Sequence, residues 1–221
     1  MTPSADLIEY YRARAHEYER VYEKPERQSD LARLHARVAA AFSGRAVLEV
    51  ACGTGYWTRR IAPTATGVTG CDLAPEVLEL ARLQQPTAHP ATFVLGDAFS
   101  LETVTGDFDA AFVGFWWSHV PMADLPRFLR RLHRRVGVGS RVFIVDNRYV
   151  EGSSHPITRV DTAGNSYQER KLADGSQYEV LKNFPAADVV RAAIQRAGAQ
   201  NVAVYELDYY WYATYAVASA V

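Results

Sequence analysis

The chain is predicted to adopt an α/β fold in which helices cover both faces of a mostly parallel β-sheet. Two observations support this fold class. Apolar, strand-like runs alternate with segments of helical period from residue 46 to residue 147. The length of 221 residues, with 48% hydrophobic and 22% charged residues, is typical of one globular domain with a sizeable core. Residues 1–221 are therefore interpreted as a single domain.

The N-terminal part of this domain is predicted to be helical. Residues 5–22 show an amphipathic pattern rich in tyrosine, and Pro25 ends it. A second helix is expected over residues 29–42, with Ser29 as its N-cap and Gly44 just beyond its last residue.

Strands and helices then follow one another along the chain. The predicted strands cover residues 46–51, 67–73, 91–98, 108–117 and 141–147. The predicted helices cover residues 75–84, 122–136 and 185–197, and residues 201–221 are expected to form two further strands. Pro75 and Pro126 are compatible with this assignment because each lies in the first turn of its helix.

Residues 148–184 interrupt this alternation because they hold no helical pattern. Two β-prone runs flank Asp174 and Gly175, and an Asp-Gly pair between such runs predicts a tight hairpin turn. We interpret residues 148–184 as a β-hairpin insertion after the fifth strand. The pattern does not decide whether it covers a ligand site or pairs with a second subunit, so a monomer and a homodimer both stay open.

Charge and cysteine content exclude several classes of function. Lys and Arg number 24 against 25 Asp and Glu, so no basic field is available to hold a nucleic-acid backbone. The two cysteines give neither a disulfide framework nor metal-ligand spacing, and free thiols are typical of a reducing compartment. The first twenty residues contain no long apolar run, so we expect a cytoplasmic protein with no membrane partner and no bound metal.

A glycine turn follows the first predicted strand in the sequence VLEVACGTG. Gly53 and Gly55 let the backbone approach a ligand closely, but the third glycine of the dinucleotide-binding pattern is missing. Glu49 stands before the turn, where a carboxylate would repel a pyrophosphate but would attract an ammonium group. A nicotinamide-dependent enzyme is therefore the weaker interpretation.

The E/D-x-x-x-G-x-G arrangement of these three residues resembles the first motif of the class I SAM-dependent methyltransferase family, of the small-molecule type. The resemblance extends in motif order over residues 45–147. It implies a Rossmann-like, seven-stranded sheet whose last strand is antiparallel. It also implies S-adenosyl-L-methionine (SAM) as methyl donor and S-adenosyl-L-homocysteine (SAH) as product.

The same resemblance assigns the cofactor contacts. It places Asp72 on the ribose hydroxyls and Asp97 on the adenine amino group, although Asp72 could also cap a helix and Asp97 could be a turn residue. Residues 1–27 resemble the helical lid of many small-molecule methyltransferases. The residues expected to contact SAM are Tyr11, Tyr18, Glu49, Ala51, Gly53, Gly55, Asp72, Leu73, Asp97, Ala98, Phe99 and Phe115.

The transferred methyl group is expected beside the end of the fourth strand. His119 follows that strand and is the candidate general base, with support of the next helix as the equal alternative. Asn147 could orient the acceptor or cap its loop. The residues expected to bind the acceptor are Trp116, Trp117 and Tyr149, although one of the two tryptophans should lie in the core.

These residues predict transfer of a methyl group to an oxygen or nitrogen atom of a small molecule, such as a metabolite of specialised biosynthesis. The N/D-P-P-Y signature of amide and base N-methyltransferases is absent, which argues against nucleobase and glutamine acceptors. A SAM-consuming lyase or cyclase, and a SAM-binding module without catalysis, share the cofactor motifs and stay open.

Overall fold

The computed structural model describes residues 9–10, 12–85, 88–89 and 91–219. The strands of the main sheet are β1 (Ala46–Val50), β2 (Gly67–Asp72), β3 (Thr92–Leu95), β4 (Ala110–Gly114), β5 (Arg141–Asn147), β9 (Ala199–Glu206) and β10 (Tyr210–Val217). The α-helices are α2 (Gln28–Ala41), α3 (Thr58–Ile61), α4 (Pro75–Gln84), α5 (Leu125–Val136) and α6 (Ala187–Arg196). The 3₁₀ helices are η1 (Ala15–Tyr22), η2 (Pro25–Arg27), η3 (Trp117–His119) and η4 (Met122–Asp124).

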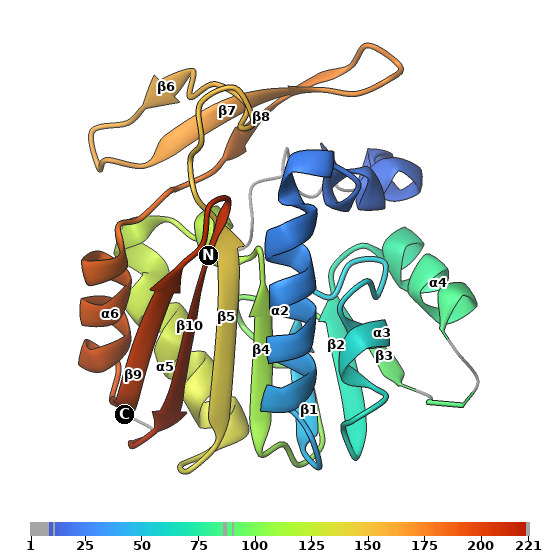
Figure 1. Ribbon diagram of the computed structural model, residues 1–221, viewed down its shortest axis with the longest axis vertical. Helices are drawn as coiled ribbons and strands as arrows, with labels where there is room; N and C mark the ends of the chain where they lie inside the picture. Colours follow the sequence, from blue (N-terminus) through green and yellow to red (C-terminus); the bar gives the residue numbers. More distant parts are fainter. Residues whose placement is uncertain (1–8, 11, 86–87, 90, 220–221) are drawn as a thin grey trace.

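The main sheet has seven strands in the order β3-β2-β1-β4-β5-β10-β9 (Figure 1). Strands β1 to β5 pair in parallel, whereas β10 is antiparallel to both β5 and β9. The predicted Rossmann-like sheet with an antiparallel last strand is confirmed. Its parallel strands all end at one edge, which is where ligands of such folds bind.

Alternate residues of the central strands pack on opposite faces of the sheet. Val47 belongs to a buried cluster with Leu34 of α2, whereas the next residue, Leu48, belongs to a cluster with Phe128 of α5 and Ile194 of α6. Both faces are therefore apolar and both are covered by helices, as a parallel sheet requires. None of the helices within the described ranges is long and apolar enough to cross a bilayer.

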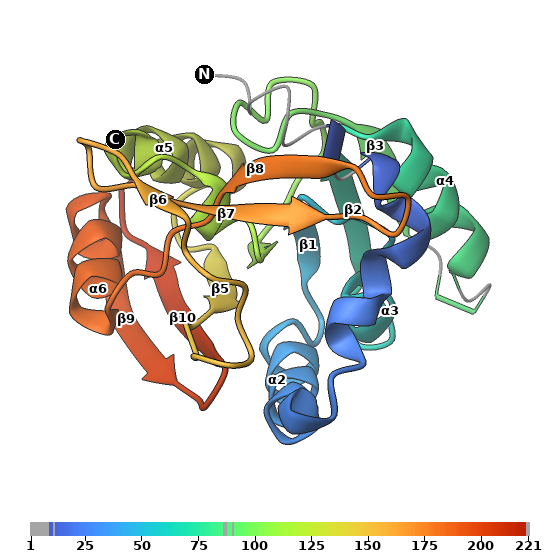
Figure 2. The same ribbon diagram turned by 90° about the horizontal axis from the view of Figure 1, so that it is seen from above.

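The insertion after β5 forms a second sheet from β6 (Arg159–Val160), β7 (Ser166–Lys171) and β8 (Gln177–Leu181). The hairpin predicted at Asp174 and Gly175 joins β7 to β8, and Gly175 has the positive φ of 90° that such a turn requires. Strand β6 was not predicted because it is only two residues long. The small sheet lies across the carboxyl ends of the parallel strands, as Figures 1 and 2 show together.

The N-terminal segment differs from its prediction as a single amphipathic helix. Within the described residues it turns at Arg14 and continues as the 3₁₀ helix η1. This segment packs on the glycine turn, so its tertiary contacts override the helical pattern. The next helix begins at Gln28, so Ser29 lies inside its first turn instead of capping it, because η2 runs directly into α2.

Candidate cofactor and acceptor site

The glycine turn after β1 has a left-handed backbone at three positions. Ala51, Gly53 and Gly55 have φ values of 53°, 54° and 75°. A Cβ atom added to Gly55 would lie 3.3 Å from the Cβ of Ala81, so this position is both conformationally restricted and crowded. Ala51 carries a Cβ atom in the same region of φ, and such a residue marks a backbone constrained by its surroundings.

Asp72 lies at the end of β2 and is hydrogen-bonded to the glycine turn. Its Oδ2 accepts a hydrogen bond of 2.9 Å from the Gly53 amide, and its Oδ1 accepts one of 3.1 Å from Ala74. Burial raises the pKa of Asp72, and the backbone N–H groups of Gly53 and Ala74 partly oppose this shift. The two sequence-predicted residues Gly53 and Asp72 thus share one site. Leu73, next in the chain, is half-buried.

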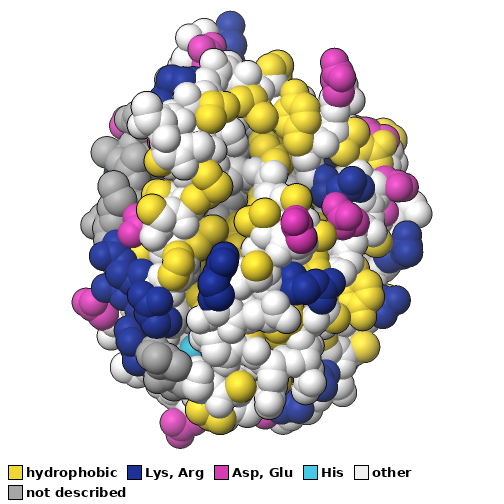
Figure 3. All heavy atoms as spheres, turned by 90° about the vertical axis from the view of Figure 1, so that its left-hand side faces the viewer, with side chains coloured by type: hydrophobic (Ala, Val, Ile, Leu, Met, Phe, Trp, Pro, Cys, Tyr) yellow, Lys and Arg dark blue, Asp and Glu magenta, His cyan; other side chains and the backbone are white. Residues whose placement is uncertain are grey.

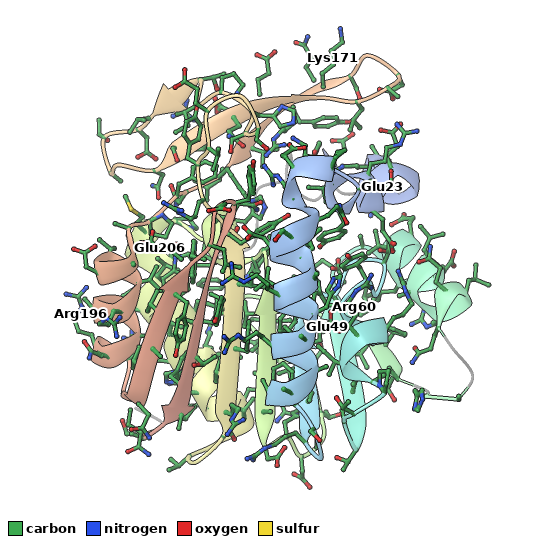
Figure 4. The ribbon with its side chains drawn as sticks, viewed as in Figure 1. Glu23, Glu49, Arg60, Lys171, Arg196 and Glu206 are labelled. Atoms are coloured by element: carbon green, nitrogen blue, oxygen red, sulfur yellow. The ribbon has the colours of Figure 1, made fainter. Side chains whose placement is uncertain are left out.

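Glu49 is buried between β1 and α3 (Figure 4). The Thr58 hydroxyl donates a hydrogen bond of 2.5 Å to its Oε2. Burial raises the pKa of Glu49 to about 8, and within the described chain no Lys or Arg lies at ion-pair distance from it. An ammonium group placed beside this carboxyl would favour its ionised form, so the site is suited to the amino acid end of SAM.

Asp97 and its two neighbours follow β3. Asp97 Oδ1 accepts a hydrogen bond of 2.8 Å from the Phe99 amide, which is the geometry of a turn residue. Ala98 is buried, and the buried Phe99 ring stacks on Phe128 of α5 at 6.3 Å between centroids. The adenine contacts of these residues stay a prediction.

Glu19, in the N-terminal segment, was not singled out from the sequence. The Thr54 hydroxyl donates a hydrogen bond of 2.8 Å to its carboxylate, and Arg59 Nη2 lies 2.7 Å from the same oxygen. These contacts fasten the N-terminal segment to the glycine turn. Tyr11 and the side chain of Tyr18 lie outside the described residues.

Tyr22 is the tyrosine of the N-terminal segment that reaches the end of β4. Its ring stacks on Tyr56 at 3.7 Å and meets the Phe115 ring edge-on at 5.8 Å between centroids. Phe115 has a φ of 58°, a strained value for a residue with a large side chain. Ring contacts with Tyr22 and Tyr210 hold Phe115 in this conformation, at the point where the sheet ends.

A cavity of about 240 Å³ adjoins the ends of β4 and β5. Three parts of the chain enclose it: the N-terminal segment, the strand ends and the insertion. The lining residues that matter here are Tyr22, Arg27, Phe115, Asn147, Arg170 and Lys182. Asn147 Oδ1 accepts a hydrogen bond of 3.1 Å from Arg27, so the predicted Asn147 does lie at a candidate acceptor site.

His119 does not lie among the residues that line this cavity. Its ring is buried, and its Nδ1 lies 2.7 Å from the Leu181 carbonyl oxygen, to which a protonated Nδ1 donates. Burial and the neighbouring charge of Lys182 hold the pKa of His119 well below its usual value. The imidazole is therefore neutral and holds the end of β8, while its role as a base stays a prediction.

Trp116, Trp117 and Tyr149 also lie outside the lining of this cavity. Trp117 is 1% exposed and packs edge-on against Trp211, with ring centroids 5.7 Å apart. Trp116 is also buried, whereas Tyr149 is 42% exposed and contacts Phe184. Their acceptor contacts stay predictions.

A buried ion pair below the cavity was missed in the sequence. Lys182 Nζ lies 3.1 Å from Asp146 Oδ1 and donates a hydrogen bond of 2.6 Å to the Ser118 hydroxyl. Asp146 Oδ2 accepts a hydrogen bond of 2.9 Å from the Ser118 amide. This network joins the insertion to β5 and to the loop after β4. The acid at Asp146, inside an apolar strand, was the available signal.

The sequence of this chain is similar to those of known methyltransferases. Residues 47–139 match a family model described as "Methyltransferase domain". The chain is 28% identical over 190 residues to malonyl-[acyl-carrier protein] O-methyltransferase of Serratia marcescens, covering 79% of this chain and 72% of that protein. It is 28% identical over 182 residues to demethylmenaquinone methyltransferase of Staphylococcus saprophyticus, covering 73% of each.

Solved structures resemble this fold over nearly its whole length. A structure described as "DhpI-SAM-HEP complex" superposes with a TM-score of 0.78 at 28% identity and covers 95% of both chains. A second, described as "DhpI-SAH complex structure", has a TM-score of 0.76 at 27% identity and covers 95% of this chain and 94% of the other. Together with the sheet order and the glycine turn, these matches show that the chain belongs to the class I SAM-dependent methyltransferases.

Proposed function

We propose that this enzyme transfers the methyl group of SAM to an oxygen or nitrogen atom of a small metabolite held in the 240 Å³ cavity. One observation carries the proposal. The cavity adjoins the end of β4 through Phe115 and the end of β5 through Asn147, beside the strand ends that carry the glycine turn and Asp72. Its small volume favours a metabolite over a macromolecule.

The residues of the glycine turn and its neighbours fit SAM. When bound, SAM supplies an electrophilic methyl group. Glu49 offers a buried carboxyl without an ion-pair partner in the described chain, which matches an ammonium group. Asp72 has carboxylate lone pairs left for two ribose hydroxyls, since each oxygen accepts only one of the hydrogen bonds described above.

The chain is arranged to position the acceptor. The N-terminal segment and the insertion close over the strand ends, and both contribute to the cavity wall. Holding two reactants in alignment can itself supply much of the rate enhancement of a displacement reaction. The relative named as an O-methyltransferase supports an oxygen acceptor.

Mass spectrometry of the reaction mixture tests the proposal. The purified enzyme is incubated with SAM, first alone and then with a panel of small hydroxy acids, phosphonates and amines. We expect SAH and a methylated acceptor in equal amounts only when the right acceptor is present. Release of methylthioadenosine from SAM alone would indicate a lyase or cyclase instead, and tight SAH binding without turnover across the panel would favour a binding module.

A further inference from the structure

The wall of the acceptor cavity carries an unusual concentration of positive charge. Six of its lining side chains are Lys or Arg, namely Arg14, Arg20, Lys24, Arg27, Arg170 and Lys182. Among the described lining residues there is no Asp or Glu. The whole chain has a formal net charge of −1, and the face shown in Figure 3 carries both signs of charge. The positive charge is therefore a local property of the cavity.

Arg27 is the most deeply placed of these cations, with an exposure of 4%. It donates hydrogen bonds to Asn147 Oδ1 at 3.1 Å, to Ser153 Oγ at 2.9 Å and to the Ser153 carbonyl at 3.2 Å. All three partners are neutral, and no carboxylate of the described residues forms an ion pair with Arg27. A buried charge without an ion-pair partner is costly, so an anionic ligand at this point would stabilise Arg27.

Lys24 adds a second charge at the same point. Its Nζ donates a hydrogen bond of 2.6 Å to the Ser153 carbonyl oxygen that Arg27 also contacts. Burial and then the charge of Arg27 lower the pKa of Lys24. The pKa of His155 is also affected by these positive charges: burial and then the charges of Arg170 and Lys24 lower it to about 4.

Tyr210 supplies a neutral donor beside these cations. Its side chain is 1% exposed and lines the cavity, and its hydroxyl forms no hydrogen bond of standard geometry with a described residue, although Arg27 lies close enough to oppose the rise in its pKa that burial causes. The Arg27 guanidinium carbon lies 5.6 Å from the centre of the Tyr210 ring. A buried hydroxyl without a partner is uncommon in folded proteins, and an oxygen atom of a ligand would satisfy it.

Acidic groups near the cavity form ion pairs with two of its six cations. Glu17 lies 3.5 Å from Arg20, and Asp146 is committed to Lys182 below the cavity floor. Glu26 accepts a hydrogen bond of 2.8 Å from the Ser153 hydroxyl, and hydrogen bonds and then the charges of Lys24 and Arg27 lower its pKa, but it is exposed and forms no ion pair with either of them among the described residues. Two positive charges thus converge on the Ser153 carbonyl, and neither forms an ion pair with a carboxylate of the described residues.

We infer that the acceptor is a small oxyanion with at least two negative charges, either a phosphoryl-type group or a pair of carboxylates, anchored by Arg27, Lys24 and the Tyr210 hydroxyl. This inference rests on the proposed function, because it names the substrate class of the same site. Arg guanidinium groups bind both kinds of oxyanion through paired hydrogen bonds, and Lys adds a point charge. The anchored anion offsets the charge that the folded chain leaves uncompensated.

Titration calorimetry on the SAH-loaded enzyme tests the inference without any turnover. The probes are ethylphosphonate for the phosphoryl class and succinate for the dicarboxylates, with diethyl ethylphosphonate and succinamide as neutral counterparts. We expect one of the two anions to bind, and its affinity to fall about tenfold in Lys24→Met and more in Arg27→Met, since each loses a charge-assisted hydrogen bond. Added salt should also weaken binding of the anion, because it screens the attraction between the charges.

Arg196→Met is the matched control, since Arg196 is exposed on α6 away from the cavity (Figure 4). It should bind the anion as the wild type does. The inference would be overturned if the neutral probes bound as tightly as the anions, or if Lys24→Met and Arg196→Met bound the anion with equal affinity. Lys24 is half-buried, so Lys24→Met tests the inference even if Arg27→Met does not fold. Methylation of a neutral acceptor would overturn the anionic substrate alone, whereas failure to bind SAH would overturn the proposed function.

Discussion

The carboxylate of Glu19 accepts a hydrogen bond of 2.8 Å from the hydroxyl of Thr54, which joins the N-terminal segment to the glycine turn. Thr54 is 1% exposed, so the contact is shielded from water on one side. Arg59 reinforces it from α3 with an ion pair of 2.7 Å. One carboxylate of the N-terminal segment therefore contacts both the glycine turn and α3.

Glu19→Ala should weaken SAH binding, because it releases the N-terminal segment from the turn. A hydrogen bond to a charged group contributes about 1.5–3 kcal/mol, and partial exposure of Glu19 reduces this to an expected loss of about three- to tenfold in affinity. Calorimetry measures the change. Glu23→Ala, an exposed acid of the same segment (Figure 4), serves as control, and equal affinities in both variants would exclude the link.

Asp72→Ala should weaken SAM binding by removing the acceptor for two ribose hydroxyls. We expect a loss of about 1.5–3 kcal/mol for each charged hydrogen bond, before replacement by water. Because Asp72 also holds the Gly53 amide, thermal unfolding of the ligand-free variant must be measured beside its affinity. A folded Asp72→Ala protein with unchanged SAM affinity would refute the ribose assignment.

Glu49 should make both stability and SAM binding depend on pH. Its pKa in the folded chain is about 8, above the usual 4.5, so it binds a proton in the folded state that the unfolded chain has lost. The ligand-free protein should therefore lose stability relative to Glu49→Gln as pH rises from about 4.5 to about 8, by up to several kcal/mol. Chemical unfolding at several pH values measures this difference.

The same group predicts proton release when SAM binds. An ammonium group beside Glu49 lowers the pKa of the carboxyl, so binding near pH 7 should release up to one proton, and affinity should rise towards pH 8. Calorimetry in buffers of different ionisation enthalpy counts the protons. No release from the wild type, or the same release from Glu49→Gln, would show that the ammonium group lies elsewhere.

His119→Asn should retain most of the turnover. The asparagine amide can donate to the Leu181 carbonyl as the imidazole Nδ1 does, and the low pKa of His119 already keeps it neutral across the working range. His119→Ala should instead lose about 1–3 kcal/mol of stability through the orphaned carbonyl. A fall in kcat of about 10²–10⁴ in His119→Asn with unchanged stability would establish the general-base role.

The positions of the glycine turn and of Asp72 could be predicted, because each lies at the end of a strand that the sequence pattern reveals. The geometry of Gly53, Asp72 and their turn depends on local backbone rules, and those rules are readable from a single sequence. Arg27 and Glu19 were not recognised, since their partners lie 120 and 35 residues away along the chain. No periodicity or spacing reveals such long-range pairs.

The contribution of the insertion to the buried ion pair could not be predicted from the sequence. Its hairpin was predicted from Asp174 and Gly175, but Lys182 reads as an ordinary surface lysine. Only the fold places it against Asp146, where its charge becomes buried. The orientation of the His119 side chain could not be predicted either, because it depends on how the end of β8 lies over the sheet.

The division of the site between continuous and scattered parts of the chain has an evolutionary consequence. The cofactor turn and its acids belong to one uninterrupted stretch, residues 47–139, whereas the cavity depends on the N-terminal segment and the insertion. The insertion can therefore vary without any change to residues 47–139, whereas the N-terminal segment also contacts the glycine turn through Glu19. Exchange of residues 148–184 between relatives would therefore show whether this segment sets the choice of acceptor.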